Sequence, residues 1–298
     1  MQRALVDVAI EKSSARAARS FPEHYGWEIG RTTLRNRPLQ AARDAETSVE
    51  RRLLEATQTY APARESPPAV DPMGLELEGC EIRTGVSMTA AQAGMMDRPA
   101  RQHVRVETWR DVHTGLARPL ATKEQRLYVC RMDSSDEVCE QRFGVACAQG
   151  LRPQSHVVVP GDGAKGLREA VLGTFPKAQY ILDHPHLKSH LYDTATAWAL
   201  EGSARHAWVS DHLEQFWAGE ARQALKSWRA HQEHAPEERL RQLIAHVTRC
   251  EEGVDYGTSH ERGWPLGAGE VESAPRYVPQ ERLKIAGACW NPDNVNSM

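Results

Sequence analysis

The 298-residue sequence has no apolar run that approaches the roughly 18 residues needed to cross a membrane. It also lacks the features of a secretory leader, because Asp7 interrupts the short apolar patch near its start and no small-residue cleavage site follows. The six cysteines are scattered, with neither a C-x-x-C pair nor zinc-finger spacing, which is typical of reduced thiols. These absences predict a cytoplasmic globular protein that folds without disulfides or a structural metal.

The sequence also lacks a strong net charge. Its total of −3 neither favours nor excludes a nucleic-acid partner. The basic residues are unevenly spread, however, and the first 37 residues carry a net charge of +3. Residues 11–37 predict two short helices separated by a break at YGW, with Arg31 and Arg35 facing outward on the second. Either a helix-turn-helix-like DNA-binding region or a surface hairpin with solvated arginines fits this pattern.

The middle of the chain alternates between strand-like and helix-like patterns. Three segments rich in branched and aromatic residues predict an antiparallel meander, and buried strands then alternate with helices. The expected strands cover residues 74–82, 102–109, 126–132, 156–160 and 178–183, and the expected helices cover 134–150 and 166–175. The resulting order, β-β-β-α-β-α-β, predicts an α/β fold with a mixed sheet.

Residues 193–258 carry an all-helical pattern in which apolar side chains recur at a period close to 3.6. The tryptophans of this stripe, Trp208, Trp217 and Trp228, could stack on nucleic-acid bases, but their helical spacing favours packing in a core. The segment is therefore expected to be a helical insertion in the α/β core.

The stretch VVVPGDGAKG, residues 157–166, raises the question of a phosphate-binding loop. Lys165 is not followed by a hydroxyl residue, as a P-loop requires, and the G-x-G-x-x-G form is also absent. What remains is Asp162 at the end of a buried strand, between two glycines. Asp183 ends the next strand in the same way, and parallel neighbours would place both acids at one edge of the sheet, where open α/β sheets bind ligands.

The sequence offers two candidate sets of metal ligands. Asp183, His186 and His190 have D-x-x-H-x-x-x-H spacing and could bind zinc, although such histidines more often serve as hydrogen-bonding or surface groups. Carboxylates from separate elements suit Mg²⁺ or Mn²⁺ better. Glu78 on the first strand and Glu272 in the late GAGEVES segment could complete such a set with Asp162.

Three motifs carry a resemblance to a known family. The sequence contains the runs PGDGAKGLREAVLGTFPKAQYILDHPHLKSHL, GWPLGAGEVESAPRYVPQERLKIAGACW and GLELEGCEIRTG. Together they resemble the DDE transposases of bacterial insertion sequences, specifically the Kra group and more distantly the Mutator-like enzymes. The resemblance implies an RNase H-like fold with a helical insertion before the last catalytic helix. It also implies divalent-metal-dependent DNA cleavage and strand transfer at the element's ends.

The resemblance also assigns roles to individual residues. Glu78, Asp162 and Glu272 match the catalytic carboxylates that hold two Mg²⁺ (or Mn²⁺) ions, and Asp183 and His186 match a supporting segment. The expected partner is double-stranded DNA, both terminal inverted repeats and target, with a homo-oligomer as a further partner. The residues expected to contact DNA are Arg31, Arg35, Arg276, Arg282 and Lys284.

The implied organisation has five parts. They are an N-terminal helical, helix-turn-helix-like region over 1–60, a linker over 61–72, the first part of the catalytic core over 73–192, the helical insertion over 193–258 and the end of the core over 259–298.

Three departures from the family pattern predict a truncated or decayed copy. Glu78 stands where the family has Asp, Pro275 follows Glu272 where a helix should continue, and the family extends beyond both ends of this sequence. The alternatives are a catalytically inactive, DNA-binding transposase remnant and a cytosolic metal-dependent phosphoesterase that uses Asp183, His186 and His190.

Overall fold

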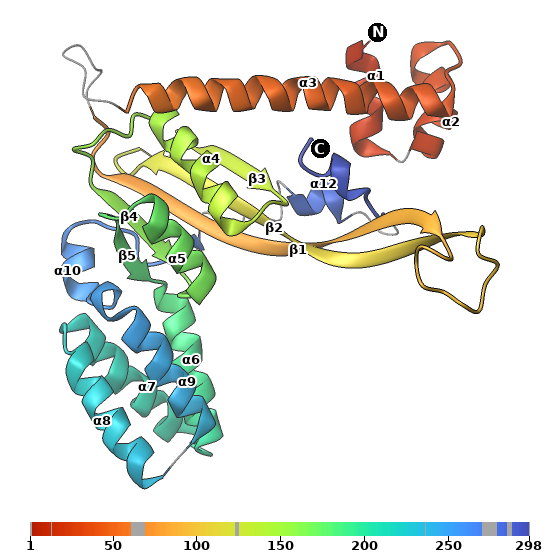
Figure 1. Cartoon of the computed structure of the whole chain (residues 1–298). Coiled ribbons are helices and arrows are strands. Elements are labelled where there is room, and N and C mark those ends of the chain that lie inside the picture. Colours follow the sequence, from red (N-terminus) through yellow and green to blue (C-terminus); the bar gives the residue numbers. More distant parts are fainter. Residues whose placement is uncertain are drawn as a thin grey trace.

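A computed structural model gives the fold of the chain (Figure 1). It describes residues 2–12, 14–60, 69–122, 125–235, 237–269, 279–284 and 288–297. At its centre is a five-stranded sheet with strand order β3-β2-β1-β4-β5. The strands are β1 Met73–Thr89, β2 His103–Pro119, β3 Leu127–Arg131, β4 Val157–Gly161 and β5 Gln179–Leu182.

The sheet is mixed, as the sequence predicted. Strand β2 is antiparallel to β1 and β3, whereas β4 is parallel to both β1 and β5. Helices α4 (Ser135–Ala148) and α5 (Lys165–Thr174) make the connections between β3, β4 and β5. The α/β class is therefore confirmed.

The first half of β1 carries apolar side chains on one face and acidic side chains on the other. Leu75 and Leu77 of β1 point into the main core, which also includes the buried faces of α4 and α5. Alternation along the strand puts Glu76 and Glu78 on the opposite face. Helix α4 begins as predicted, because Ser134 and Glu137 form a capping box in which each side chain accepts from the other residue's backbone N–H.

The N-terminal region differs from the two short helices expected. Helices α1 (Gln2–Glu11) and α2 (Ser14–Tyr25) pack on the start of α3 (Arg31–Gln58) around a small separate core, which includes Phe21 and Leu34. The break at YGW is present, and Gly26 has a φ of 73° there. Helix α3 continues far beyond residue 37 because its second half packs on α4, where Leu53 lies against Gly144.

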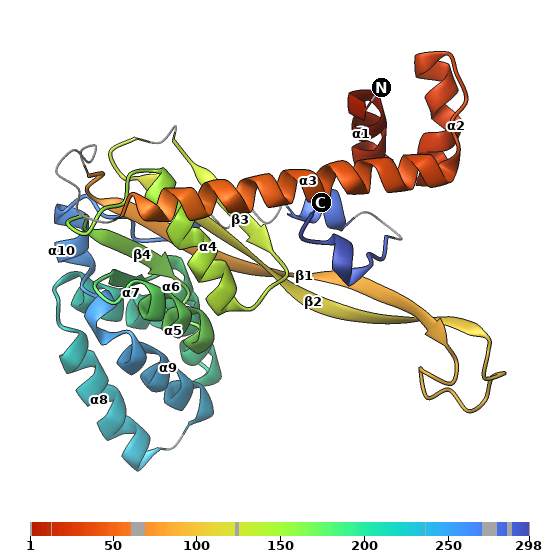
Figure 2. The ribbon, with the colours of Figure 1, turned by 45° about the horizontal axis from the view of Figure 1, so that its top comes forward.

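Helix α3 lies along the α4 side of the sheet and holds the small N-terminal core at its far end (Figures 1 and 2). Arg131, at the end of β3, fixes the helix to the sheet. Its guanidinium lies 3.1 Å from the Glu46 carboxylate and 3.0 Å from that of Glu50, both on α3, and 2.6 Å from Asp133. This network is partly buried, so salt screens it less than an exposed pair.

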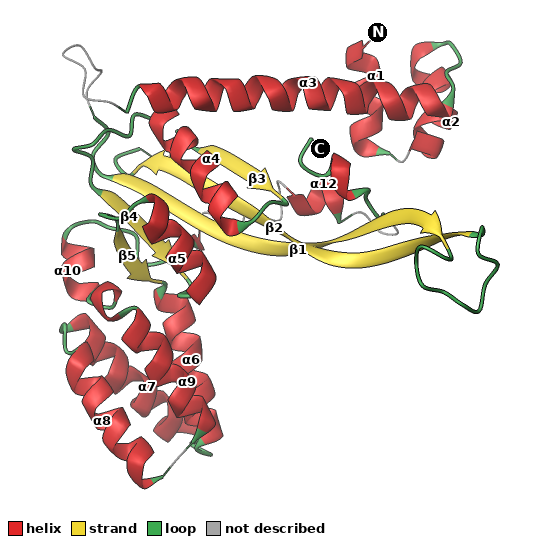
Figure 3. Cartoon of the chain, in the orientation of Figure 1, coloured by secondary structure: helices red, strands yellow, loops and turns green. Residues whose placement is uncertain are grey.

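A helical unit follows β5 (Figure 3). It consists of α6 (His184–Ala197), α7 (Gly202–Trp217), α8 (Ala221–His234) and α9 (Glu238–Arg249), then a 3-10 turn, Glu251–Gly253, and α10 (Tyr256–Glu261). Trp228 is 2% exposed and Trp208 packs against the same core, as the helical spacing predicted. Trp217 differs, because it is 39% exposed and lies at the rim beside His260.

Strands β1 and β2 are longer than predicted and extend beyond the sheet as a two-stranded ribbon (Figure 2). Two short C-terminal elements, α12 (Glu281–Leu283) and a 3-10 turn over Pro292–Asn294, follow in the last part of the chain. This C-terminal segment supports the base of the ribbon, where Leu283 and Val295 pack on Ile82 and Val112. No described helix is both long and apolar enough to cross a membrane.

Candidate carboxylate site at the sheet edge

Asp162 and Asp183 lie at the same edge of the sheet. The parallel pairing of β4 with β5 runs from Val158–Gln179 to Gly161–Leu182, so the next residue on each strand is Asp162 and Asp183. Both acids therefore follow the carboxyl ends of parallel strands, which is the arrangement that the sequence predicted.

Glu78 lies on β1, the strand that is parallel to β4 and adjacent to it. Gly74 pairs with Val158 in the parallel register of β1 and β4, and Glu78 and Asp162 each lie four residues further along. Because side chains alternate along a strand, Glu78 lies on the same face of β1 as Gly74, whereas Asp162 follows the last residue of β4. Two of the three predicted carboxylates thus lie the same number of residues beyond the last β1–β4 pair.

The turn after β4 holds Asp162 firmly. Its Oδ1 accepts a hydrogen bond from the Ala164 N–H at 2.8 Å, while the Gly163 N–H donates to the Tyr180 hydroxyl at 2.9 Å. Gly163 has a φ of 78°, a conformation that glycine adopts without steric cost. The Asp162 side chain is therefore presented by a turn whose backbone donors are satisfied.

Asp183 has a different environment, because its side chain is fully buried. One oxygen accepts from the His186 N–H at 2.8 Å and lies 3.0 Å from His186 Nδ1, while the other accepts from the Ala268 N–H at 2.7 Å. Asp183 thus caps α6 and anchors residues 266–268, whose Leu266 carbonyl accepts from the His184 N–H at 2.8 Å. These hydrogen bonds show that Asp183 has a structural role.

Zinc binding by Asp183, His186 and His190 finds no support in this geometry. Within the described ranges, no group of three or more His, Cys, Asp or Glu side chains is placed to hold a metal ion. His190 instead lies against His246 of α9, with ring centroids 4.6 Å apart. Burial is the main reason why the pKa of His190 is lowered.

The third predicted carboxylate, Glu272, lies outside the described residues, as do Pro275 and Arg276. The last well-anchored point before it is Ala268, four residues earlier, which Asp183 holds at the sheet edge. Gly267 is needed at this anchor, since a Cβ there would lie 3.1 Å from Asp183 Oδ2.

Basic side chains occur beside Glu78 and at the N-terminal end of α3. Arg282 lies in α12 and Lys284 directly follows it. Burial raises the pKa of the Cys80 thiol, two residues after Glu78, and Lys284 opposes this change. Arg31 and Arg35 are exposed in the first turns of α3. The two pairs are therefore on separate parts of the molecule.

Three residues of this region were not predicted from the sequence. Tyr180 and His246 contact the Asp162 turn, and Glu76 is 2% exposed on the same face as Glu78, one pleat away. The alternation of LELEG was a usable signal for Glu76. Nothing in the sequence indicated His246, which reaches the turn from a helix more than 80 residues later.

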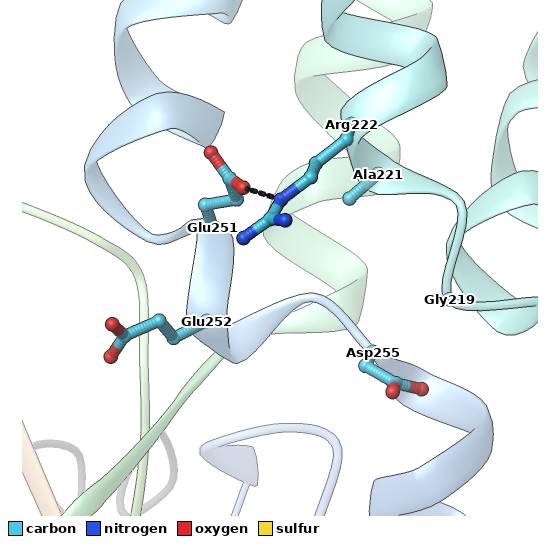
Figure 4. Close-up of a pocket in the computed structure, with 6 residues that line it drawn as sticks. All are labelled: Gly219, Ala221, Arg222, Glu251, Glu252 and Asp255. Atoms are coloured by element: carbon cyan, nitrogen blue, oxygen red, sulfur yellow. Dashed lines mark hydrogen bonds and ion pairs between the residues drawn. The ribbon is translucent and has the colours of Figure 1, made fainter.

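A separate cavity of about 120 Å³ lies where α7 meets α8, away from the predicted carboxylates (Figure 4). In it the Arg222 Nε donates to Glu251 at 2.7 Å. Its lining residues are Gly219, Ala221, Arg222, Glu251, Glu252 and Asp255.

Comparison with known proteins adds no assignment. Neither the known protein families nor the curated proteins include a match to this chain.

Proposed function

We propose that this chain is a DDE-type transposase with an RNase H-like core, which cleaves DNA at insertion-sequence ends and joins it to a target. The observation that carries the proposal is that Glu78 and Asp162 each lie four residues beyond the Gly74–Val158 pair, on the adjacent parallel strands β1 and β4 or directly after them. The predicted third carboxylate, Glu272, follows four residues after the Ala268 anchor at that edge. Together, these positions are consistent with the three-motif resemblance.

The donor set fits a hard divalent cation. Glu78 and Asp162 offer carboxylate oxygens, which Mg²⁺ and Mn²⁺ prefer, and the Ala164 N–H leaves Asp162 Oδ2 available for further contacts. When bound, such ions lower the pKa of an attacking water and stabilise the leaving oxygen of a phosphodiester. The protein's contribution is to hold the carboxylates in place and to present basic side chains to the DNA.

Two basic surfaces would position the DNA. Lys284 near Cys80 of β1, and Arg282 near Cys130 of β3, would contact phosphates near the cleavage point. Arg31 and Arg35 would contact DNA at a distance, because the small N-terminal core is held at the far end of α3 (Figure 1). Phosphate contacts of this kind supply affinity and orientation but little sequence discrimination.

The fold supports the same assignment. The order β-β-β-α-β-α-β, followed by a helical unit before the Glu272 segment, is the one that the resemblance implies. The rival hypothesis is a DNA-binding remnant without catalytic activity, and Glu78, one methylene longer than Asp, favours it. A phosphoesterase based on Asp183 is disfavoured by the three backbone and side-chain contacts that occupy that carboxylate.

A nicking assay separates these hypotheses. The full chain is incubated with a supercoiled plasmid carrying the DNA that flanks its own coding sequence, with Mn²⁺ or with EDTA. We expect Mn²⁺-dependent nicking that falls at least about 100-fold in Asp162→Asn and in Glu272→Gln. Glu252→Gln, an exposed acid in the separate cavity, is the matched control and should nick normally.

The outcomes of this assay support different hypotheses. DNA binding without nicking by the wild-type protein would support the inactive remnant. Nicking that Asp162→Asn leaves unchanged would overturn the carboxylate assignment.

A further inference from the structure

His246 on α9, in the helical unit, contacts the turn that carries Asp162. If Gly163 carried a Cβ, it would lie 2.7 Å from His246 Cε1 and 3.1 Å from Nε2. The imidazole therefore occupies the space that any side chain at position 163 would need. The contact joins residues 83 positions apart, from two different parts of the fold.

The turn is held from its other side by the sheet. Tyr180 of β5 accepts the Gly163 N–H at 2.9 Å, and a Cβ on Gly161 would lie 2.5 Å from the same hydroxyl. Gly163 is thus enclosed between Tyr180 and Leu182 of the sheet and the imidazole of His246. Its φ of 78° makes the left-handed turn that directs Asp162 out of the strand.

The imidazole acts here through its shape. Its Nε2 is inaccessible to solvent and has no hydrogen-bond partner among the residues described. Burial, followed by His190 and Arg249, lowers the pKa of His246 to about 4, although Asp162 opposes this change. The flat ring packs directly on the glycine backbone.

We infer that His246 is a positioning residue for Asp162. The helical unit thereby contributes to the geometry of the carboxylate site. Removing the ring would leave a void over Gly163, and the turn that carries Asp162 could then open toward it. This inference rests on the proposed function for its catalytic consequence. The packing relationship itself does not depend on that function.

The test compares His246→Ala and His246→Phe with the wild-type full chain. The matched control is His234→Ala, an exposed histidine of the same helical unit whose Nδ1 lies 2.7 Å from the Ala230 carbonyl oxygen. The first readout is hydrogen–deuterium exchange at the amides of Gly163 and Ala164, the donors to Tyr180 and Asp162. We expect exchange at least about tenfold faster in His246→Ala, and close to wild type in His246→Phe, which keeps a ring in place.

The second readout is the Mn²⁺ concentration that gives half-maximal nicking. We expect His246→Ala to raise it about tenfold and to change the rate at saturating Mn²⁺ much less, because the carboxylate is displaced but present. A purely structural role would lower the melting temperature without moving this midpoint. The phenylalanine variant should restore the midpoint.

The outcomes distinguish this inference from the proposed function. If His246→Ala matches His234→Ala in both readouts, His246 has no positioning role and the inference is wrong. If the wild-type chain shows no Mn²⁺-dependent nicking, the proposed function fails, and the exchange rates alone decide whether His246 holds the turn.

Discussion

The Asp183 carboxylate joins the end of β5 to the segment that leads to Glu272, because its Oδ2 accepts the Ala268 N–H at 2.7 Å. The other oxygen accepts the His186 N–H at the start of α6 and also lies close to His186 Nδ1. One buried side chain therefore fixes two elements at the sheet edge. Few substitutions could preserve all of these contacts, since each depends on an acceptor in a defined direction.

Replacing Asp183 by Asn should therefore destabilise the protein. Asn has a single acceptor oxygen, so one of the two backbone donors, at His186 or Ala268, would face an amide N–H₂. We expect the free energy of unfolding to fall by about 1–3 kcal/mol, as measured by urea denaturation. Asp193→Asn, on an exposed position of the same helix, should change it by less than about 0.5 kcal/mol. Equal stability of the two variants would contradict the anchoring role.

Local patterns in the sequence were enough to predict the sheet and its edge. Segments rich in branched and aromatic residues indicated the first three strands, and the ends of the next two strands located Asp162 and Asp183. The length of α3 was missed because it depends on tertiary packing, with Leu53 lying on Gly144. The extension of β1 and β2 likewise depends on the C-terminal segment.

The environment of each acid could not be predicted in the same way. Asp162 and Asp183 have similar sequence contexts, yet one is presented by a turn and the other is fully buried as an anchor. The difference arises from Ala268 and His246, which approach from distant parts of the chain. Such contacts leave no local periodicity or spacing that sequence reasoning could use.

The Glu78 side chain can be tested by shortening it. Under the proposed function, Glu78→Asp restores the carboxylate length found in the family. We expect it to increase Mn²⁺-dependent nicking by about tenfold or more, because errors near 1 Å in catalytic placement are costly. Glu81→Asp, on an exposed position of the same strand, is the control and should have no effect. A decrease in nicking on shortening Glu78 would mean that this site uses the longer side chain.

Arg31 and Arg35, near the N-terminal end of α3, should control DNA affinity through phosphate contacts. We expect Arg31→Ala and Arg35→Ala each to weaken binding to duplex DNA and to reduce the slope of log K against log salt by about 0.9. Arg52→Ala, exposed near the other end of the same helix, should leave both quantities unchanged. Fluorescence anisotropy over a salt series measures both. A uniform effect of all three variants would indicate a general charge effect without a defined DNA-binding surface.

His212 should make the protein sensitive to mild acid. Burial lowers its pKa below the ordinary value of 6.5, and its ring lies between Trp208 and Trp228. The unfolded chain therefore binds a proton more readily than the folded one, so this contribution to stability is present above pH 6.5 and is lost as pH falls below it.

Replacing His212 by Phe should flatten the decline of the melting temperature between about pH 6.5 and pH 5, because the ring remains but no longer titrates. His206→Phe is the matched control. His206 Nδ1 lies 2.7 Å from the Gly202 carbonyl oxygen, and His212 Nδ1 lies 2.7 Å from that of Trp208. His206, however, is exposed. An unchanged pH profile in the His212 variant would show that the acid sensitivity arises elsewhere.

Arg142 of α4 is fully buried, and its Nε and Nη1 have no hydrogen-bond partner among the described residues. Burial lowers the pKa of Arg142, and its guanidinium lies 5.5 Å from the centroid of the Phe175 ring. Because removing a charge from water costs several kcal/mol, Arg142→Met should raise the free energy of unfolding by about 1 kcal/mol or more. Urea denaturation measures this change, and Arg241→Met, at an exposed position on α9, should have almost no effect. A loss of stability on replacing Arg142 would instead show that its cation–π contact with Phe175 outweighs the desolvation of its charge.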